Sequence, residues 1–82
     1  MLSELLEGPK SIGLKQSQRA VMEETAHCAY VAQDAESHVT EPFMALCREH
    51  DVTVYTVSTM KQLGEACGID VGAAVVVLLK QQ

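Results

Sequence analysis

Three basic side chains surround a glycine near the start of the chain. Lys10, Lys15 and Arg19 lie on either side of Gly13, and no acidic residue occurs between positions 10 and 22. An amphipathic helical pattern opens directly after Gly13, so this glycine stands at a helix N-terminus, where unpaired N–H groups and the helix dipole favour an anion. Lys15 and Arg19 share one helix face because they are four residues apart. The segment predicts an anion-binding helix start, and a merely solvated basic face is the alternative.

A second segment places apolar residues between two glycines. Ile69, Asp70 and Val71 lie between Gly68 and Gly72, after a helical pattern and before a strongly apolar run. The two β-branched side chains either pack inward, as apolar loop residues often do, or form an exposed contact, such as a shelf for an unstacked nucleobase. The sequence leaves both interpretations open.

The cysteines are typical of structural thiols. Cys28, Cys47 and Cys67 are odd in number and scattered through apolar segments, unlike the framework of a small secreted disulfide protein. They indicate buried thiols in a reducing cytoplasm. Cys47 and His50 have a spacing that can place two ligands on one metal, but no Cys-x-x-Cys or His-x-x-x-His pair accompanies them. We therefore expect no metal, no cofactor and no enzymatic activity; a thiol or zinc enzyme would require bound metal or a cysteine with a lowered pKa.

The segments that must position these residues alternate between strand and helix. Hydrophobic periodicity and β-branched composition predict strands and helices in alternation. The predicted strands are 11–13, 27–32, 52–57 and 75–79, and the predicted helices cover 14–24, a segment opening at Thr40, and a segment from Thr59 to Gly68.

Two helix starts have specific signals. Thr40 is expected to be an N-cap, with Glu41 complementing the helix dipole and Pro42 tolerated in the first turn. Thr59 and Gln62 match the Thr-x-x-Gln capping box.

Length and order of elements together predict the fold class. The chain has 82 residues, of which 48% are hydrophobic, so residues 1–82 form a single domain with one core. Alternating strands and helices predict an α/β protein, a three-layer α-β-α sandwich with a central mixed four-stranded sheet. The acidic N-terminus lacks the features of a signal peptide, and the longest apolar run, Ala73–Leu79, is far too short to span a bilayer. We expect a cytoplasmic protein without a membrane partner.

The net charge of −5 is unevenly distributed along the chain. Residues 10–22 carry +3, whereas residues 23–51 carry −6, and residues 52–82 are neutral. A nonspecific polyanion binder needs a wide basic surface, which this chain does not have. The charge pattern is therefore compatible only with a narrow anion contact near the first helix.

Two separated segments resemble one known family. Residues 13–19 and 60–74 are similar to two signatures of the ribosomal protein L7Ae family, whose members bind kink-turn RNA. The most specific part is Leu63-Gly64 followed by Cys67 to Val71. The likeness runs from about Lys10 to Leu79, includes Ala32-Gln33-Asp34-Ala35, and is greatest to short bacterial members.

The resemblance implies a sandwich that docks at the sharp bend of a kink-turn. In the family, the first-helix motif lies beside tandem sheared G·A pairs, and the late loop presses apolar residues against extruded bases. Lys15 and Gln16 would then contact base edges or backbone, and Arg19 would contact guanine or phosphate. The complete set of RNA-binding residues that the resemblance implies is Gly13, Leu14, Lys15, Gln16, Arg19, Lys61, Ile69, Asp70 and Val71.

The main hypothesis is a noncatalytic, monomeric RNA-binding protein that recognises kink-turns in ribosomal or regulatory RNA and is associated with the ribosome. The acidic residues in the middle of the chain predict that residues 34–51 face away from the RNA phosphates. The same acids motivate the competing hypothesis, a protein-interaction scaffold of this fold without RNA binding.

Overall fold

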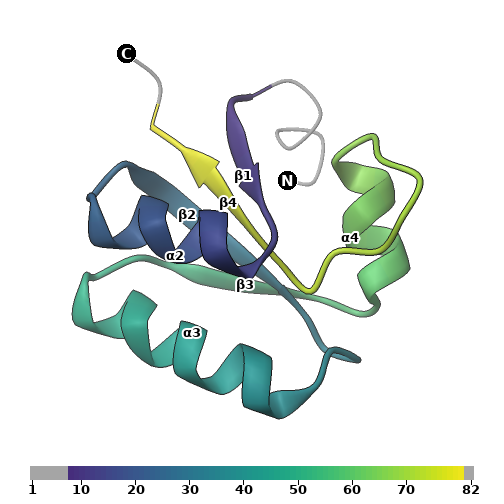
Figure 1. The fold of residues 1–82 in the computed structure, drawn as a ribbon, viewed down its shortest axis with the longest axis horizontal. Coiled ribbons are helices and arrows are strands. Elements are labelled where there is room, and N and C mark those ends of the chain that lie inside the picture. The colour runs from purple at the N-terminus through teal and green to yellow at the C-terminus, as the bar shows by residue number, and fades with distance from the viewer. Residues whose placement is uncertain (1–7, 81–82) are drawn as a thin grey trace.

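Strands and helices alternate along the chain as the sequence predicts. The computed structural model describes residues 8–80. Its elements, in chain order, are β1 (Lys10–Ile12), α2 (Leu14–Met22), β2 (Ala26–Ala32), α3 (Ser37–Glu49), β3 (Val54–Val57), α4 (Met60–Ala66) and β4 (Val75–Leu79) (Figure 1).

The four strands form one mixed sheet in the order β1-β4-β2-β3. The strand β4 pairs antiparallel with both β1 and β2, whereas β2 and β3 are parallel. Because β4 is central and covered on both faces, its residues are apolar without alternation. This arrangement brings the first and last strands of the chain together.

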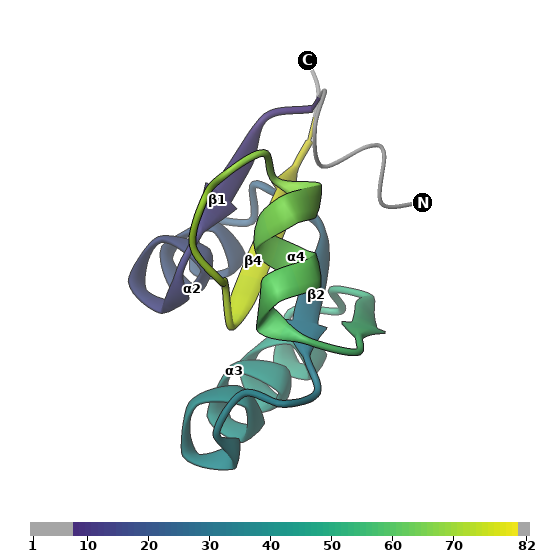
Figure 2. The same cartoon turned by 90° about the vertical axis from the view of Figure 1, so that its right-hand side faces the viewer.

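Helices cover both faces of the sheet, which confirms the predicted three-layer sandwich. On one face, α2 and α3 pack through Val21, Phe43 and Cys47 against Val75 and Val77. On the other face, α4 packs through residues that include Leu63 and Cys67 against Tyr30, Val76 and Leu78. Figure 2 shows α4 in front of β4, with α2 and α3 set apart from it.

The start of α3 differs from the prediction. The helix begins at Ser37, and the carbonyl of Glu36 accepts hydrogen bonds from Val39 N–H (3.0 Å) and Thr40 N–H (3.2 Å). Thr40 is therefore not the N-cap but a buried residue within the helix, on the face that carries Phe43. Pro42 lies inside the helix at an exposed position, so the amide hydrogen bond that it cannot make is lost on the solvent side. Burial of Thr40 outweighs the local preference for a helix start there.

The helix α4 follows its local signals. Thr59 is the N-cap, and its Oγ1 accepts a hydrogen bond of 3.0 Å from Gln62 N–H. Gly68 follows the C-cap with φ 77°, a left-handed conformation that favours glycine. The two ends of this short helix are therefore encoded locally.

The first and third strands shift slightly from their predicted bounds. The strand β1 covers Lys10–Ile12 rather than 11–13, because Gly13 already turns toward α2. The strand β3 begins at Val54 rather than Val52, since Val52 N–H donates to the Cys47 carbonyl at the end of α3 (2.8 Å).

No helix within residues 8–80 is long and apolar enough to cross a membrane.

The three cysteines are buried, as predicted. Burial raises the pKa of Cys47 from 9.0 to about 11. Burial also raises the pKa of Cys67, and the nearby Lys10 ammonium partly opposes this effect. Both groups are therefore neutral thiols near pH 7, which disfavours a role as nucleophiles.

The raised pKa of Cys47 predicts a loss of stability in alkali. Below pH 9 the thiol is protonated in both states, whereas between pH 9 and about 11 only the unfolded chain ionises. The free energy of unfolding should therefore fall over this interval, by roughly 2–3 kcal/mol from this group. Urea titrations at several pH values measure the change. A Cys47→Ala variant, although less stable overall, should lose this part of the pH dependence; an identical slope in both proteins would contradict the assignment.

Candidate functional site

The backbone of Gly13 joins the two signature segments. Its N–H donates a hydrogen bond of 3.1 Å to the carbonyl of Val75, and the preceding Ile12 pairs with Val76. Residues 69–74 lead directly into Val75, so the end of this loop lies next to the start of α2 (Figure 1). Segments from opposite ends of the chain therefore meet at this point.

The start of α2 leaves its first amide groups available. Gly13 has φ 96°, a conformation that L side chains rarely adopt, and its carbonyl accepts Ser17 N–H at 3.0 Å to open the helix. No side chain caps this helix, and no acidic residue occurs in its first turn. The positive end of α2 is therefore not neutralised by its own residues.

The polar side chains of α2 point outward because the opposite face is anchored. Ser17 is fully buried, and its hydroxyl donates to the Ser11 carbonyl at 3.2 Å. Leu14 is half-buried against the core beneath α2 and α3. Lys15, Gln16 and Arg19 are exposed, and neither cation is paired with a carboxylate within residues 8–80. The predicted contact residues of this helix thus form a free basic face.

The loop after α4 is held against that helix by its backbone. Ile69 N–H donates to the Gly64 carbonyl at 3.1 Å, and Ala73 N–H donates to the Met60 carbonyl at 3.0 Å. A Cβ at Gly64 would collide with the carbonyl oxygen of Val71. A Cβ at Gly72 would lie 3.1 Å from the Met60 Cβ, closer than nearly all real contacts of this kind. The loop path therefore depends on close approach to α4 over its whole length.

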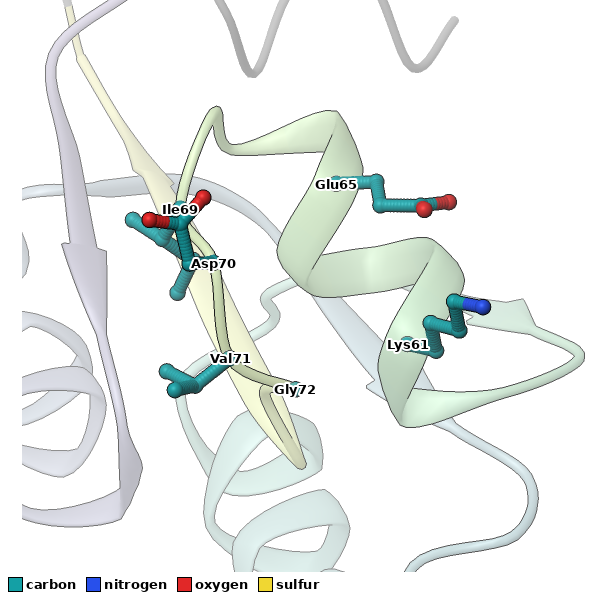
Figure 3. Close-up of a pocket in the computed structure, with 6 residues that line it drawn as sticks. All are labelled: Lys61, Glu65, Ile69, Asp70, Val71 and Gly72. Atoms are coloured by element: carbon teal, nitrogen blue, oxygen red, sulfur yellow. The ribbon is translucent and has the colours of Figure 1, made fainter.

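The two apolar side chains of the loop have different environments. Ile69 is partly buried and packs against the core beneath α4, whereas Val71 is 69% exposed. Figure 3 shows Val71 on the side of the loop away from α4, and Asp70 is exposed beside it. The structure thus shows inward packing for Ile69 and exposure for Val71.

Lys61 lies on a different part of the surface. It lines a pocket of about 180 Å³ between α4 and the loop, together with Glu65, Ile69, Asp70, Val71 and Gly72. Figure 3 shows the Lys61 side chain pointing away from the loop. The pocket contains side chains of both charges, so it is not a simple anion site. Lys61 therefore shares this pocket with Val71, although its ammonium group is directed away from the loop.

Two supporting residues were not identified as functional by sequence reasoning. Gly64 permits the approach of the loop, and Asp34 accepts a hydrogen bond from Met60 N–H at 2.8 Å. A glycine inside a helix lowers helix stability by about 1 kcal/mol relative to alanine, so Gly64 was a detectable signal of close packing. Asp34 had no comparable signal, because its partner is distant in the sequence.

Metal ligation has no support in the described part of the chain. Within residues 8–80, no three or more His, Cys, Asp and Glu side chains are close enough to hold a metal ion. Cys47 is fully buried, whereas the neighbouring His50 is partly exposed.

Comparison with known proteins assigns the family. Residues 8–82 match the model of the Ribosomal protein L7Ae/L30e/S12e/Gadd45 family. The chain belongs to this family. The RNA-binding protein TTE2299 of Caldanaerobacter subterraneus is 43% identical over 63 residues, which cover 77% of each chain. The RNA-binding protein YbxF of Geobacillus stearothermophilus is 45% identical over 69 residues, which cover 84% of each chain. This membership identifies a noncatalytic protein, as the sequence predicts.

Two solved structures are also similar to this chain. The 15.5kD RNA binding protein of Giardia lamblia superposes with a TM-score of 0.91 at 20% identity, covering 99% of this chain and 72% of that one. A protein of unknown function from Bacillus halodurans superposes with a TM-score of 0.87 at 22% identity, covering 96% of this chain and 83% of that one. At these identities the likeness establishes the fold alone.

Gly64→Ala provides a test of the loop packing. Where a helical glycine has free space around it, replacement by alanine raises the free energy of unfolding by about 1 kcal/mol. Here the added Cβ must displace the Val71 carbonyl, so we expect the free energy of unfolding to fall by roughly 1–3 kcal/mol. Urea titration measures the sign, and Glu65→Ala on the exposed side of the same helix serves as the control. A more stable Gly64→Ala protein would contradict the described packing.

Proposed function

We propose that this protein binds RNA and recognises kink-turns through one surface, formed by the start of α2 and the loop at 69–74. The observation that carries the proposal is the hydrogen bond between Gly13 and Val75, which joins the start of the basic helix α2 to the end of the loop that carries the exposed Val71. Relatives that are named RNA-binding proteins support the general function. Kink-turn recognition accounts for the particular combination of features.

The charge distribution favours recognition by shape. A kink-turn presents sheared pairs and unstacked bases at a bend, which proteins can read without entering the narrow A-form major groove. The surface offers Lys15 and Arg19 as cations, although the whole chain carries a net charge of −5. Two cations cannot supply the broad phosphate neutralisation that nonspecific binding requires. Binding therefore depends on simultaneous contact by the helix and the loop.

Each exposed residue of α2 has a chemically defined role in this proposal. The Gln16 amide can both donate and accept hydrogen bonds at base edges. The Arg19 guanidinium can bind guanine or phosphate with two parallel hydrogen bonds, and Lys15 acts as a point charge toward base edges or backbone. Gly13 and Leu14 contribute by positioning: one opens the helix, and the other packs it on the core.

The loop supplies the apolar contact. Val71 is exposed and would cover the face of an unstacked base, while Ile69 supports the loop from the core side. Asp70 is exposed beside Val71 and can accept hydrogen bonds from base amino groups. Lys61 points away from the loop, so its contribution is a longer-range attraction to phosphate.

Preorganisation lowers the free-energy cost of binding. The loop is hydrogen-bonded to the backbone carbonyls of Gly64 and Met60 in α4 before RNA is present. Little backbone ordering is then required in the complex, which favours affinity from a small contact area. We further propose that the RNA is ribosomal or regulatory, and that the protein acts in the cytoplasm as a monomer associated with the ribosome.

Arg19→Ala should weaken binding to a kink-turn duplex. Loss of a specific guanidinium contact is expected to cost about 1–3 kcal/mol in a titration at fixed salt. If Arg19 contacts phosphate, the dependence of affinity on salt should also become shallower, whereas a guanine contact should leave it nearly unchanged. Arg48→Ala removes the same side chain from an exposed position on α3, outside the proposed interface, and is the matched control.

Two results would count against the proposal. Equal affinity of the wild type and Arg19→Ala would remove Arg19 from the interface. Equal affinity of the wild type for a kink-turn and for a copy with the G·A pairs replaced would remove kink-turn recognition. Failure to shift either RNA, together with retained protein partners, would favour the scaffold function that the exposed acids of α3 suggest.

A further inference from the structure

One carboxylate links the turn after β2 to the start of α4. Asp34 is exposed, and its Oδ1 accepts a hydrogen bond of 2.8 Å from Met60 N–H. The two residues are far apart in the sequence, so this contact belongs to the tertiary structure rather than to the helix itself. A carboxylate acceptor makes such a hydrogen bond stronger than a neutral one.

Met60 also supports the RNA-binding loop. Its carbonyl accepts Ala73 N–H at 3.0 Å, and Gly72 lies so close that a Cβ added there would approach the Met60 Cβ to 3.1 Å. The position of Met60 therefore sets the backbone directly after Val71. A shift of Met60 would be transmitted to the loop through its carbonyl, while its N–H is held by Asp34.

These contacts close a ring. Ala32 N–H donates to the Ala74 carbonyl at 2.9 Å, and the neighbouring Ala73 N–H donates to the Met60 carbonyl. Met60 N–H in turn donates to the carboxylate of Asp34, which lies two residues after Ala32. Two of the three hydrogen bonds join backbone groups and do not depend on side-chain identity. The Asp34 carboxylate is the side-chain member of the ring, and thus the link that a substitution can open.

We propose that Asp34 is a positioning residue for RNA recognition: by holding Met60, it holds the loop that presents Val71. This inference rests on the proposed function of the loop. Removal of the negative charge of Asp34 should therefore reduce the affinity for RNA, whereas charge alone would predict an increase.

A general role in capping α4 gives a different expectation. Thr59 caps the same helix locally through Gln62 N–H, without contact to β2. If Asp34 only stabilised the helix, loss of the Thr59 hydroxyl would have the same effect on RNA binding. Thr59→Ala is therefore the matched structural control.

The experiment measures affinity for a kink-turn duplex at fixed salt, with thermal unfolding of each variant recorded in parallel. Asp34→Ala should bind roughly fivefold to tenfold more weakly, from the lost charged hydrogen bond. Asp34→Asn should bind within about twofold of the wild type, because its amide oxygen can still accept the Met60 N–H. Thr59→Ala should be less stable but retain its affinity, and Glu49→Ala, which removes a remote exposed carboxylate, should bind no more weakly than the wild type.

A double-mutant cycle provides a readout that general destabilisation does not affect. Val71→Ala should lose most of its effect when combined with Asp34→Ala, because the loop is already displaced. Arg19→Ala should weaken binding by the same factor in both backgrounds, because α2 is positioned by Gly13 rather than by Asp34.

The outcomes separate this inference from the function on which it rests. Wild-type affinity in Asp34→Ala, or equal weakening in Thr59→Ala, would overturn the positioning role while leaving kink-turn recognition intact. A wild-type protein that does not distinguish the kink-turn from its G·A-replaced copy would overturn the proposed function and this inference together.

Discussion

The hydrogen bond from Gly13 N–H to the Val75 carbonyl is the constraint on which the candidate site depends. It joins the last residue before α2 to the first residue of β4, and it exists because β1 and β4 are neighbours in the sheet. The basic residues of α2 and the apolar loop before β4 therefore have a fixed relation. Without this strand order, the two motifs would be separate surface features with no common ligand.

Given this arrangement, the acidic composition argues against only one kind of RNA binding. A net charge of −5 argues against nonspecific binding to RNA, but it does not argue against a small contact at a helix start. Lys15 and Arg19 are unpaired within residues 8–80, and Val71 is exposed in the loop that leads to Val75, the hydrogen-bond partner of Gly13. Affinity in the proposed complex then comes from shape and from unstacked bases, so the low positive charge becomes a source of selectivity.

The sequence was most informative where local chemistry decides the structure. The capping box of Thr59 and the uninterrupted apolar run of β4 were predictable, because turn chemistry and burial on both faces leave clear patterns. The start of α3 was not, since burial of Thr40 within the helix overrides the N-cap preference. The opposite environments of Ile69 and Val71 depend on the backbone of α4, and the Asp34 contact depends on the meeting of distant segments. Neither could be read from neighbouring residues.

The most direct measurement is an NMR titration of the labelled protein with a kink-turn duplex. The central claim is that the helix start and the loop bind RNA as one preformed surface. It predicts simultaneous changes in the amide signals of residues 13–19 and 69–75, with small changes over the outer face of α3, and no such response to a duplex without the G·A pairs. Changes confined to one of the two segments, or centred on α3, would contradict the account.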